Sequence, residues 1–207
     1  MQLFLTSSID TVAKSVAKKI GNPHQLKVAF VTTASEVEEG DKSWVDEIKQ
    51  TLIVANFNQI IDYTFTNKNA AQIFKDLQLF DIILLNGGNV PYLLKVMHQT
   101  GAFQVVRDLI LKKNKIYIGS SAGAMVAGSS IKELEKLDGE KYSSDQLECL
   151  NFTPFVIAPH WGSDDFKKEY FSLRERFYTD KYPFVMLPND SYLWVKDNYF
   201  KFIQVKT

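Results

Sequence analysis

The stretch KIYIGSSAGAMVAG, residues 115–128, joins an apolar run to an alanine-rich run through a set of small residues. The β-branched residues and the tyrosine at its start favour a strand, and the alanines at its end favour a helix. Between them, Gly119, Ser121 and Gly123 fit G-x-S-x-G, in which small neighbours leave room for a serine on a sharp turn. The stretch therefore predicts the strand-to-helix turn of an α/β fold. It presents the Ser121 hydroxyl and the Ala122 N–H to the same space, although a simple packing turn of small residues has the same pattern.

Apolar runs alternate with amphipathic stretches along the chain, as in α/β proteins. The runs that we expect to be strands are 3–7, 27–33, 80–86, 115–120, 154–160 and 183–188. They are continuously apolar, which predicts a mostly parallel sheet covered by helices on both faces. Apolar residues at helical spacing predict crossover helices over 45–57, 70–80, 91–114 and 164–181. The final segments predict an antiparallel hairpin at the sheet edge, with strands over 190–195 and 199–205.

The composition is that of one globular domain spanning residues 1–207, because 45% of the residues are hydrophobic and 23% are charged. Lys+Arg and Asp+Glu both number 24, so no excess charge favours nucleic acid or a lipid surface, and small molecules or short peptides are the expected partners.

We expect a cytoplasmic protein, since we find no secretory leader or long apolar span. The single cysteine, Cys149, is expected to be a buried filler. The polar stretch 132–148 is expected to be a surface excursion. For the oligomeric state, the sequence is compatible with a monomer and with a homodimer.

A second strand end carries LNGGNVPYLL, residues 85–94, with a proline near the start of the helix that follows. Its two glycines allow a backbone N–H to approach a ligand closely, as an oxyanion donor must. Asn89 in the same turn is a candidate substrate contact. A glycine-rich turn can also cradle a phosphate, but the further glycines and the lysine of a nucleotide loop are missing.

A third strand end, in VIAPHWGSDD over 156–165, delivers His160 to the same edge of the sheet. The other two histidines lie in a loop (His24) and on a predicted helix (His98), so His160 is the general-base candidate. A structural or surface histidine is the ordinary alternative. The sequence contains no H-E-x-x-H or C-x-x-C spacing, and we expect neither a metal nor a cofactor.

Four segments, LNGGNVPYLL, YIGSSAGAM, LNFTPFVIAPH and LPNDSYLWV, occur in the order and approximate spacing of the aspartyl dipeptidase (peptidase E) family of serine peptidases. The chain resembles that family over nearly its full length. The resemblance implies a flavodoxin-like α/β domain related to class I glutamine amidotransferases, and hydrolysis of short peptides with an N-terminal aspartate. It implies that Ser121 is the nucleophile, His160 the base, and the amides of Gly88 and Ala122 the oxyanion hole. A glutaminase would need a cysteine where this chain has Ser121.

The third member of the triad falls on one of two neighbouring residues. Ungapped counting back from Val195 puts Asn189 where the family has an acid, and Asp190 follows one residue later. A carboxylate stabilises an imidazolium by charge, whereas an amide can only orient the ring. Residue chemistry therefore favours Asp190, the count favours Asn189, and we prefer Asp190 with Asn189 as the alternative. The Pro-Asn-Asp-Ser sequence is also ordinary turn chemistry.

Recognition of an N-terminal aspartate calls for a cation near the base. The helix expected after His160 offers Arg174 and Arg176 as candidate substrate-binding residues, although a solvated face paired with Glu169 and Glu175 would look the same. The sequence thus predicts a serine peptidase for dipeptides or short peptides. The alternatives are a catalytically silent relative that binds a peptide or an amino-acid-like ligand, and an esterase that uses the same turn.

Overall fold

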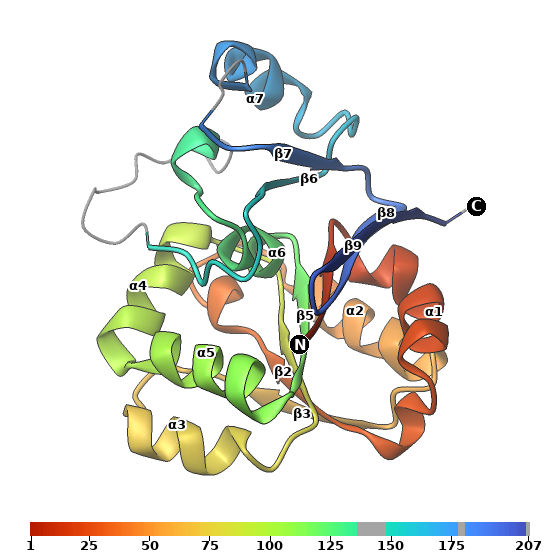
Figure 1. The fold of residues 1–207 in the computed structure, drawn as a ribbon, viewed down its shortest axis with the longest axis vertical. Helices are drawn as coiled ribbons and strands as arrows, with labels where there is room; N and C mark the ends of the chain where they lie inside the picture. Colours follow the sequence, from red (N-terminus) through yellow and green to blue (C-terminus); the bar gives the residue numbers. More distant parts are fainter. Residues whose placement is uncertain (136–147, 178–180, 206–207) are drawn as a thin grey trace.

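A computed structural model of the protein describes residues 1–135, 148–177 and 181–205. A sheet of seven strands, in the order β3-β2-β4-β5-β1-β8-β9, forms its centre (Figure 1). Five strands pair in parallel, and β8 and β9 extend the sheet in antiparallel fashion from β1. The bounds are β1 (Gln2–Thr6), β2 (Lys27–Val31), β3 (Gln59–Tyr63), β4 (Ile82–Leu85), β5 (Ile116–Ser120), β8 (Ser191–Lys196) and β9 (Tyr199–Gln204). The predicted α/β class and the C-terminal hairpin are confirmed.

Helices cover both faces of this sheet (Figure 1). One face carries α1 (Ile9–Ile20) and α2 (Ser43–Val54). The other carries α3 (Ala70–Leu77), α4 (Val90–Thr100), α5 (Ala102–Lys113) and α6 (Ala122–Ala127). Short 3-10 turns span Pro23–Gln25, Thr33–Ser35, Lys132–Leu134 and Arg174–Phe177. Within β1, Leu3 and Leu5 pack on one side and Phe4 on the other, all fully buried, because successive side chains of a strand alternate between faces. The core is therefore two apolar layers with the sheet between them.

Two of the predicted strands do not join the main sheet. β6 (Val156–Pro159) and β7 (Phe184–Leu187) pair in parallel with each other as a separate small sheet. Three of the four residues of β7 are only half-buried, so this strand lacks the cover on both faces that a central strand has. The short helix α7 (Lys167–Ser172) lies above the pair in Figure 1. It replaces the long helix expected over 164–181, of which residues 178–180 lie outside the described part.

Other boundaries also differ from the prediction. The helix expected over 91–114 is two helices, because Gly101 adopts a φ of 76° and ends α4. The edge strand β3 and the helix α1 were not predicted. The surface excursion expected over 132–148 falls mainly on residues 136–147, which are outside the described residues.

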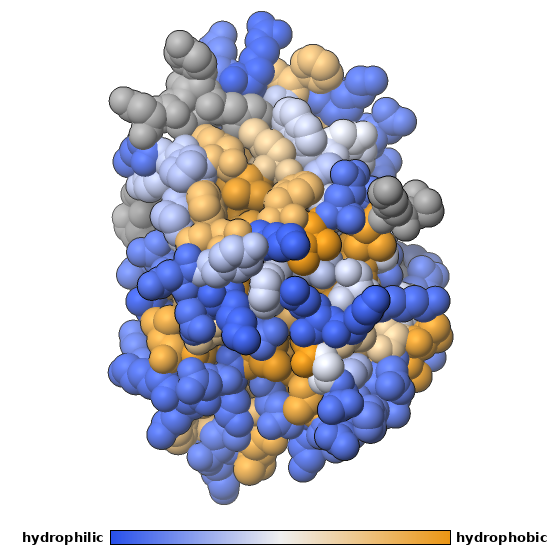
Figure 2. All heavy atoms as spheres, turned by 45° about the vertical axis from the view of Figure 1, so that its right-hand side comes forward, coloured by the Kyte–Doolittle hydropathy of each residue, from blue (hydrophilic) through white to orange (hydrophobic). Residues whose placement is uncertain are grey.

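Polar and charged groups cover much of the face drawn in Figure 2, and apolar groups are exposed between them, most extensively in its upper half. Cys149 is buried, as expected of a filler, and burial raises the pKa of its thiol to about 12. Within the described ranges, no helix is both long and apolar enough to cross a membrane.

Candidate active site

Ser121 sits on a sharp turn directly after β5, with φ 49° and ψ −110°. The turn requires the glycines on both sides of it. A Cβ at Gly119 would lie 2.4 Å from the carbonyl oxygen of Gly123, and a Cβ at Gly123 would lie 2.0 Å from that of Leu85. The Ser121 N–H donates to the Thr6 carbonyl at 3.0 Å, which ties the turn to β1. The G-x-S-x-G pattern is thus a steric requirement of the backbone at this place.

His160 follows β6 and lies against the Ser121 hydroxyl. Its Nε2 is 2.9 Å from Ser121 Oγ, within the range for proton transfer. Its own backbone is left-handed, with φ 60°. On the far side of the ring, Nδ1 lies 2.8 Å from Oδ1 of Asn189. Pro159 pairs with Leu187 across β6 and β7. His160 and Asn189, which follow these two residues, therefore lie at the same end of the small sheet.

Asp190 does not face His160, so the preference for it is not met by the geometry. Its Oδ1 accepts from Ser191 Oγ at 3.0 Å, and its Oδ2 accepts from Gln204 Nε2 at 3.0 Å. The carboxylate therefore belongs to the start of the β8–β9 hairpin. Of the two neighbours, the one given by the ungapped count, Asn189, contacts the imidazole.

Ser7, at the carboxyl end of β1, is a member of this cluster that sequence reasoning missed. Its hydroxyl accepts from the His160 N–H at 2.6 Å and donates to Asn189 Oδ1 at 2.9 Å. The available signal was its position, since β1 is a buried parallel strand whose carboxyl end lies beside that of β5.

The environment of His160 favours a neutral ring. Burial lowers the pKa of His160 below its ordinary value, against smaller raising contributions from the Asn189 hydrogen bond and from Asp10 and Asp165. Phe166 stacks on the ring with centroids 4.7 Å apart and an interplanar angle of 10°. A neutral imidazole held this way beside a serine hydroxyl can accept its proton.

The glycine-rich turn after β4 approaches the turn that carries Ser121, residues 119–123, which we call the elbow. Gly88 has a φ of 127°, and a Cβ there would lie 2.4 Å from the Ala34 carbonyl oxygen. A Cβ at Gly87 would lie 3.3 Å from Ser121 Cβ. Ala122 is the first residue of α6, so its N–H has no partner in a preceding helical turn. Asn89 uses Oδ1 to accept from the Tyr92 N–H at 2.8 Å, and so caps α4.

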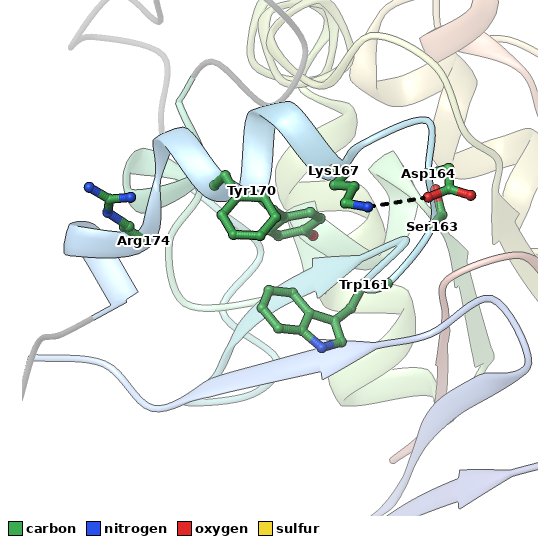
Figure 3. Close-up of a pocket in the computed structure, with 8 residues that line it drawn as sticks. Trp161, Ser163, Asp164, Lys167, Tyr170 and Arg174 are labelled. Carbon is green, nitrogen blue, oxygen red and sulfur yellow. Dashed lines mark ion pairs between the residues drawn. The ribbon is translucent and has the colours of Figure 1, made fainter.

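A pocket of about 390 Å³ begins at the residue after His160 (Figure 3). Trp161 and Tyr170 meet edge to face in it, with centroids 5.0 Å apart. Lys167, which lies 3.9 Å from Asp164, and Arg174 come from the helical segment on its other side. Arg174 therefore lines the same cavity as Trp161, the residue after His160, while His160 itself is not among the lining residues and the side chain of Arg176 lies outside what the structure describes. Over residues 1–135, 148–177 and 181–205, no three His, Cys, Asp or Glu side chains are grouped to hold a metal ion.

Comparison with known proteins identifies the family. The model of peptidase family S51 matches residues 3–203. The chain belongs to peptidase family S51. Membership places the S51 chain among the peptidases, which are hydrolases, and agrees with the resemblance seen in the sequence.

Individual relatives of the S51 chain agree with this. An uncharacterized peptidase of Pasteurella multocida (strain Pm70) is 31% identical over 168 residues, 80% of this chain and 79% of its own. Peptidase E of Shewanella oneidensis is 36% identical over 83 residues, 40% of this chain and 34% of its own. A solved structure from Listeria monocytogenes EGD-e, described as a "Putative Peptidase E Protein", superposes with a TM-score of 0.88 at 25% identity, covering 99% of this chain and 98% of that one.

Proposed function

We propose that the chain is a serine peptidase with the triad Ser121, His160 and Asn189. The observation that supports it is the continuous contact from Ser121 Oγ to His160 Nε2 at 2.9 Å and from His160 Nδ1 to Asn189 Oδ1 at 2.8 Å. Nucleophile, base and orienting group therefore stand in the order that acyl transfer requires.

The reaction uses these groups in two steps. Ser121 Oγ attacks the carbonyl carbon of the scissile bond while its proton passes to Nε2 of His160. The N–H groups of Gly88 and Ala122 donate to the oxyanion that forms. The C–N bond then breaks as His160 returns the proton to the leaving amine. Water, deprotonated by His160, attacks the acyl-enzyme and releases the acid, and the proton returns to Ser121.

Asn189 changes the energetics of this mechanism. Its carbonyl oxygen can accept from a protonated Nδ1 and so hold the ring in the tautomer that leaves Nε2 free. It carries no charge to stabilise the imidazolium. Turnover slower than that of a Ser-His-Asp enzyme follows. The same residue is what favours the second candidate function, a silent relative that retains the pocket to bind a peptide or an amino-acid-like ligand.

The proposed substrates are dipeptides or short peptides, with N-terminal aspartate among them. Arg174 and Lys167 on the helical wall of the pocket offer positive charge for a carboxylate, and Trp161, across from that helix, and Tyr170, on it, offer apolar surface. The cavity of about 390 Å³ is at the small end of ligand sites, which suits a short substrate.

The test is hydrolysis of a panel of X-Leu dipeptides, Asp-Leu included, by the wild type and by Ser121→Ala, together with labelling by a fluorophosphonate. We expect turnover and labelling in the wild type and neither in the variant. A folded wild type that cleaves no dipeptide and takes no label would favour the silent binding protein. Labelling and ester cleavage without dipeptide cleavage would favour an esterase.

Specificity is tested by Arg174→Ala, with Lys168→Ala as the matched control, because Lys168 is exposed and does not line the pocket. We expect Arg174→Ala to raise KM for Asp-Leu more than for Ala-Leu, since only the first carries a side-chain carboxylate. Equal changes for both substrates would remove Arg174 from aspartate recognition.

A further inference from the structure

Ser7 is completely buried, and its hydroxyl joins two parts of the proposed triad. The oxygen accepts from the main-chain N–H of His160 at 2.6 Å, and the O–H donates to Oδ1 of Asn189 at 2.9 Å. A third group, Nδ1 of His160, lies 3.4 Å from the same oxygen. One hydroxyl thus contacts the backbone of the base and the side chain of its partner.

Strand pairing fixes the place of this hydroxyl. Ser7 directly follows β1, its N–H donates to the Ser191 carbonyl at 3.5 Å, and Thr6 pairs with Tyr192 in β8. His160 and Asn189 instead follow β6 and β7, which form the other sheet. Ser7 is therefore a polar contact between the sheet that carries Ser121 and the sheet that carries the His–Asn pair.

An asparagine in the triad has an ambiguity that an aspartate lacks. A carboxylate presents an oxygen whichever way it turns, but an amide presents either its oxygen or its NH₂ group. With Oδ1 toward His160, the ring proton lies on Nδ1 and Nε2 can accept the proton of Ser121. With the NH₂ toward His160, Nδ1 must accept, the ring proton moves to Nε2, and His160 cannot act as base.

We propose that Ser7 is a positioning residue that selects the amide orientation of Asn189, and with it the tautomer of His160 that can take the proton of Ser121. In the observed orientation, the buried O–H of Ser7 has Oδ1 as its acceptor. If the amide turned over, that O–H would meet a donor, and the remaining acceptor, Nδ1 at 3.4 Å, would be taken by the amide N–H. A buried O–H without an acceptor is costly, so the turned state is disfavoured. The catalytic consequence rests on the proposed function, but the tautomer does not.

A double-mutant cycle separates selection of the amide from simple anchoring of His160. Ser7→Ala is made in the wild type and in Asn189→Asp, and kcat and KM are measured for the best dipeptide. We expect Ser7→Ala to lower kcat by roughly 10- to 100-fold with Asn189 present, with little change in KM, and to have a much smaller effect with aspartate at 189. An equal loss in both backgrounds would show that Ser7 only holds the main chain of His160, and would overturn the proposal.

The imidazole tautomer is read directly by ¹⁵N NMR of His160, which needs no turnover. We expect Nδ1 to carry the proton in the wild type and in Ser8→Ala, a matched control whose hydroxyl bonds Asp10 instead. Ser7→Ala should shift the proton toward Nε2, and Ser7→Thr, which keeps a hydroxyl, should restore it. An unchanged tautomer in folded Ser7→Ala would overturn the proposal even if the protein cleaves peptides, and unfolding of Ser7→Ala in both backgrounds would do the same.

Discussion

If the proposed triad of Ser121, His160 and Asn189 is catalytic, replacing Asn189 by aspartate should strengthen it. The substitution puts a negative charge where Oδ1 now lies, 2.8 Å from Nδ1 of His160. Two unit charges about 4 Å apart attract by about 4 kcal/mol at an effective dielectric constant of about 20, and by about 1 kcal/mol in bulk water. Asn189 is exposed and His160 is half-buried, so we take about 2 kcal/mol for the imidazolium in the transition state, which corresponds to about 30-fold in rate.

The assay is kcat/KM for dipeptide hydrolysis as a function of pH. We expect Asn189→Asp to raise kcat/KM by about 30-fold and to move its acid limb to higher pH, because the carboxylate favours the protonated ring and raises the pKa of His160. The matched control is Asp190→Asn. It should leave both quantities close to the wild-type values, since the Asp190 carboxylate bonds Ser191 and Gln204. A folded Asn189→Asp enzyme with unchanged or lower kcat/KM and an unmoved acid limb would refute the triad.

Three further outcomes follow from the site. Burial lowers the pKa of His160, so the base stays neutral to lower pH, and the acid limb of wild-type kcat/KM should lie below the ordinary histidine value of about 6.5; a limb above that value would contradict it. Gly123→Ala puts a Cβ 2.0 Å from the Leu85 carbonyl oxygen, and should cost about 2 kcal/mol or more and lower Tm by roughly 4–8 °C; an unchanged melting curve would show that the elbow can relax. Phe166→Ala removes the ring stacked on His160, and should lower kcat by about tenfold with a smaller effect on KM. An increase in KM with unchanged kcat would instead place Phe166 in substrate binding.

Most of the main sheet could be predicted from the sequence, because short apolar runs such as 80–86 and 115–120 are typical of strands that are buried on both faces. β3 was not predicted because it is an edge strand. Its residues are all at least partly exposed, so it has no continuous apolar run. α1 was recoverable, since its buried residues Ile9, Val12, Ala13, Val16 and Ala17 follow helical spacing. That β6 and β7 leave the main sheet could not be foreseen, because their apolar runs look like those of central strands.

In the site, Ser121 and His160 were accessible to motif reasoning because the elbow glycines and a histidine at a strand end are local signals. The choice between Asn189 and Asp190 was not local. It depends on the pairing of Pro159 with Leu187 across β6 and β7, which sets which side chain faces the imidazole. Ser7 could not be predicted for the same reason, since its partners His160 and Asn189 lie 153 and 182 residues away in the chain.

The proposed nucleophile and the proposed base both have a positive φ, 49° at Ser121 and 60° at His160. For a residue with a side chain, this conformation costs about 1–2 kcal/mol, and glycine adopts it freely. The folded protein would therefore gain stability from glycine at either position and lose its chemistry in the same step. Stability and activity are thus in direct conflict at Ser121 and His160, and variants selected only for a higher melting temperature would tend to lose these two residues first.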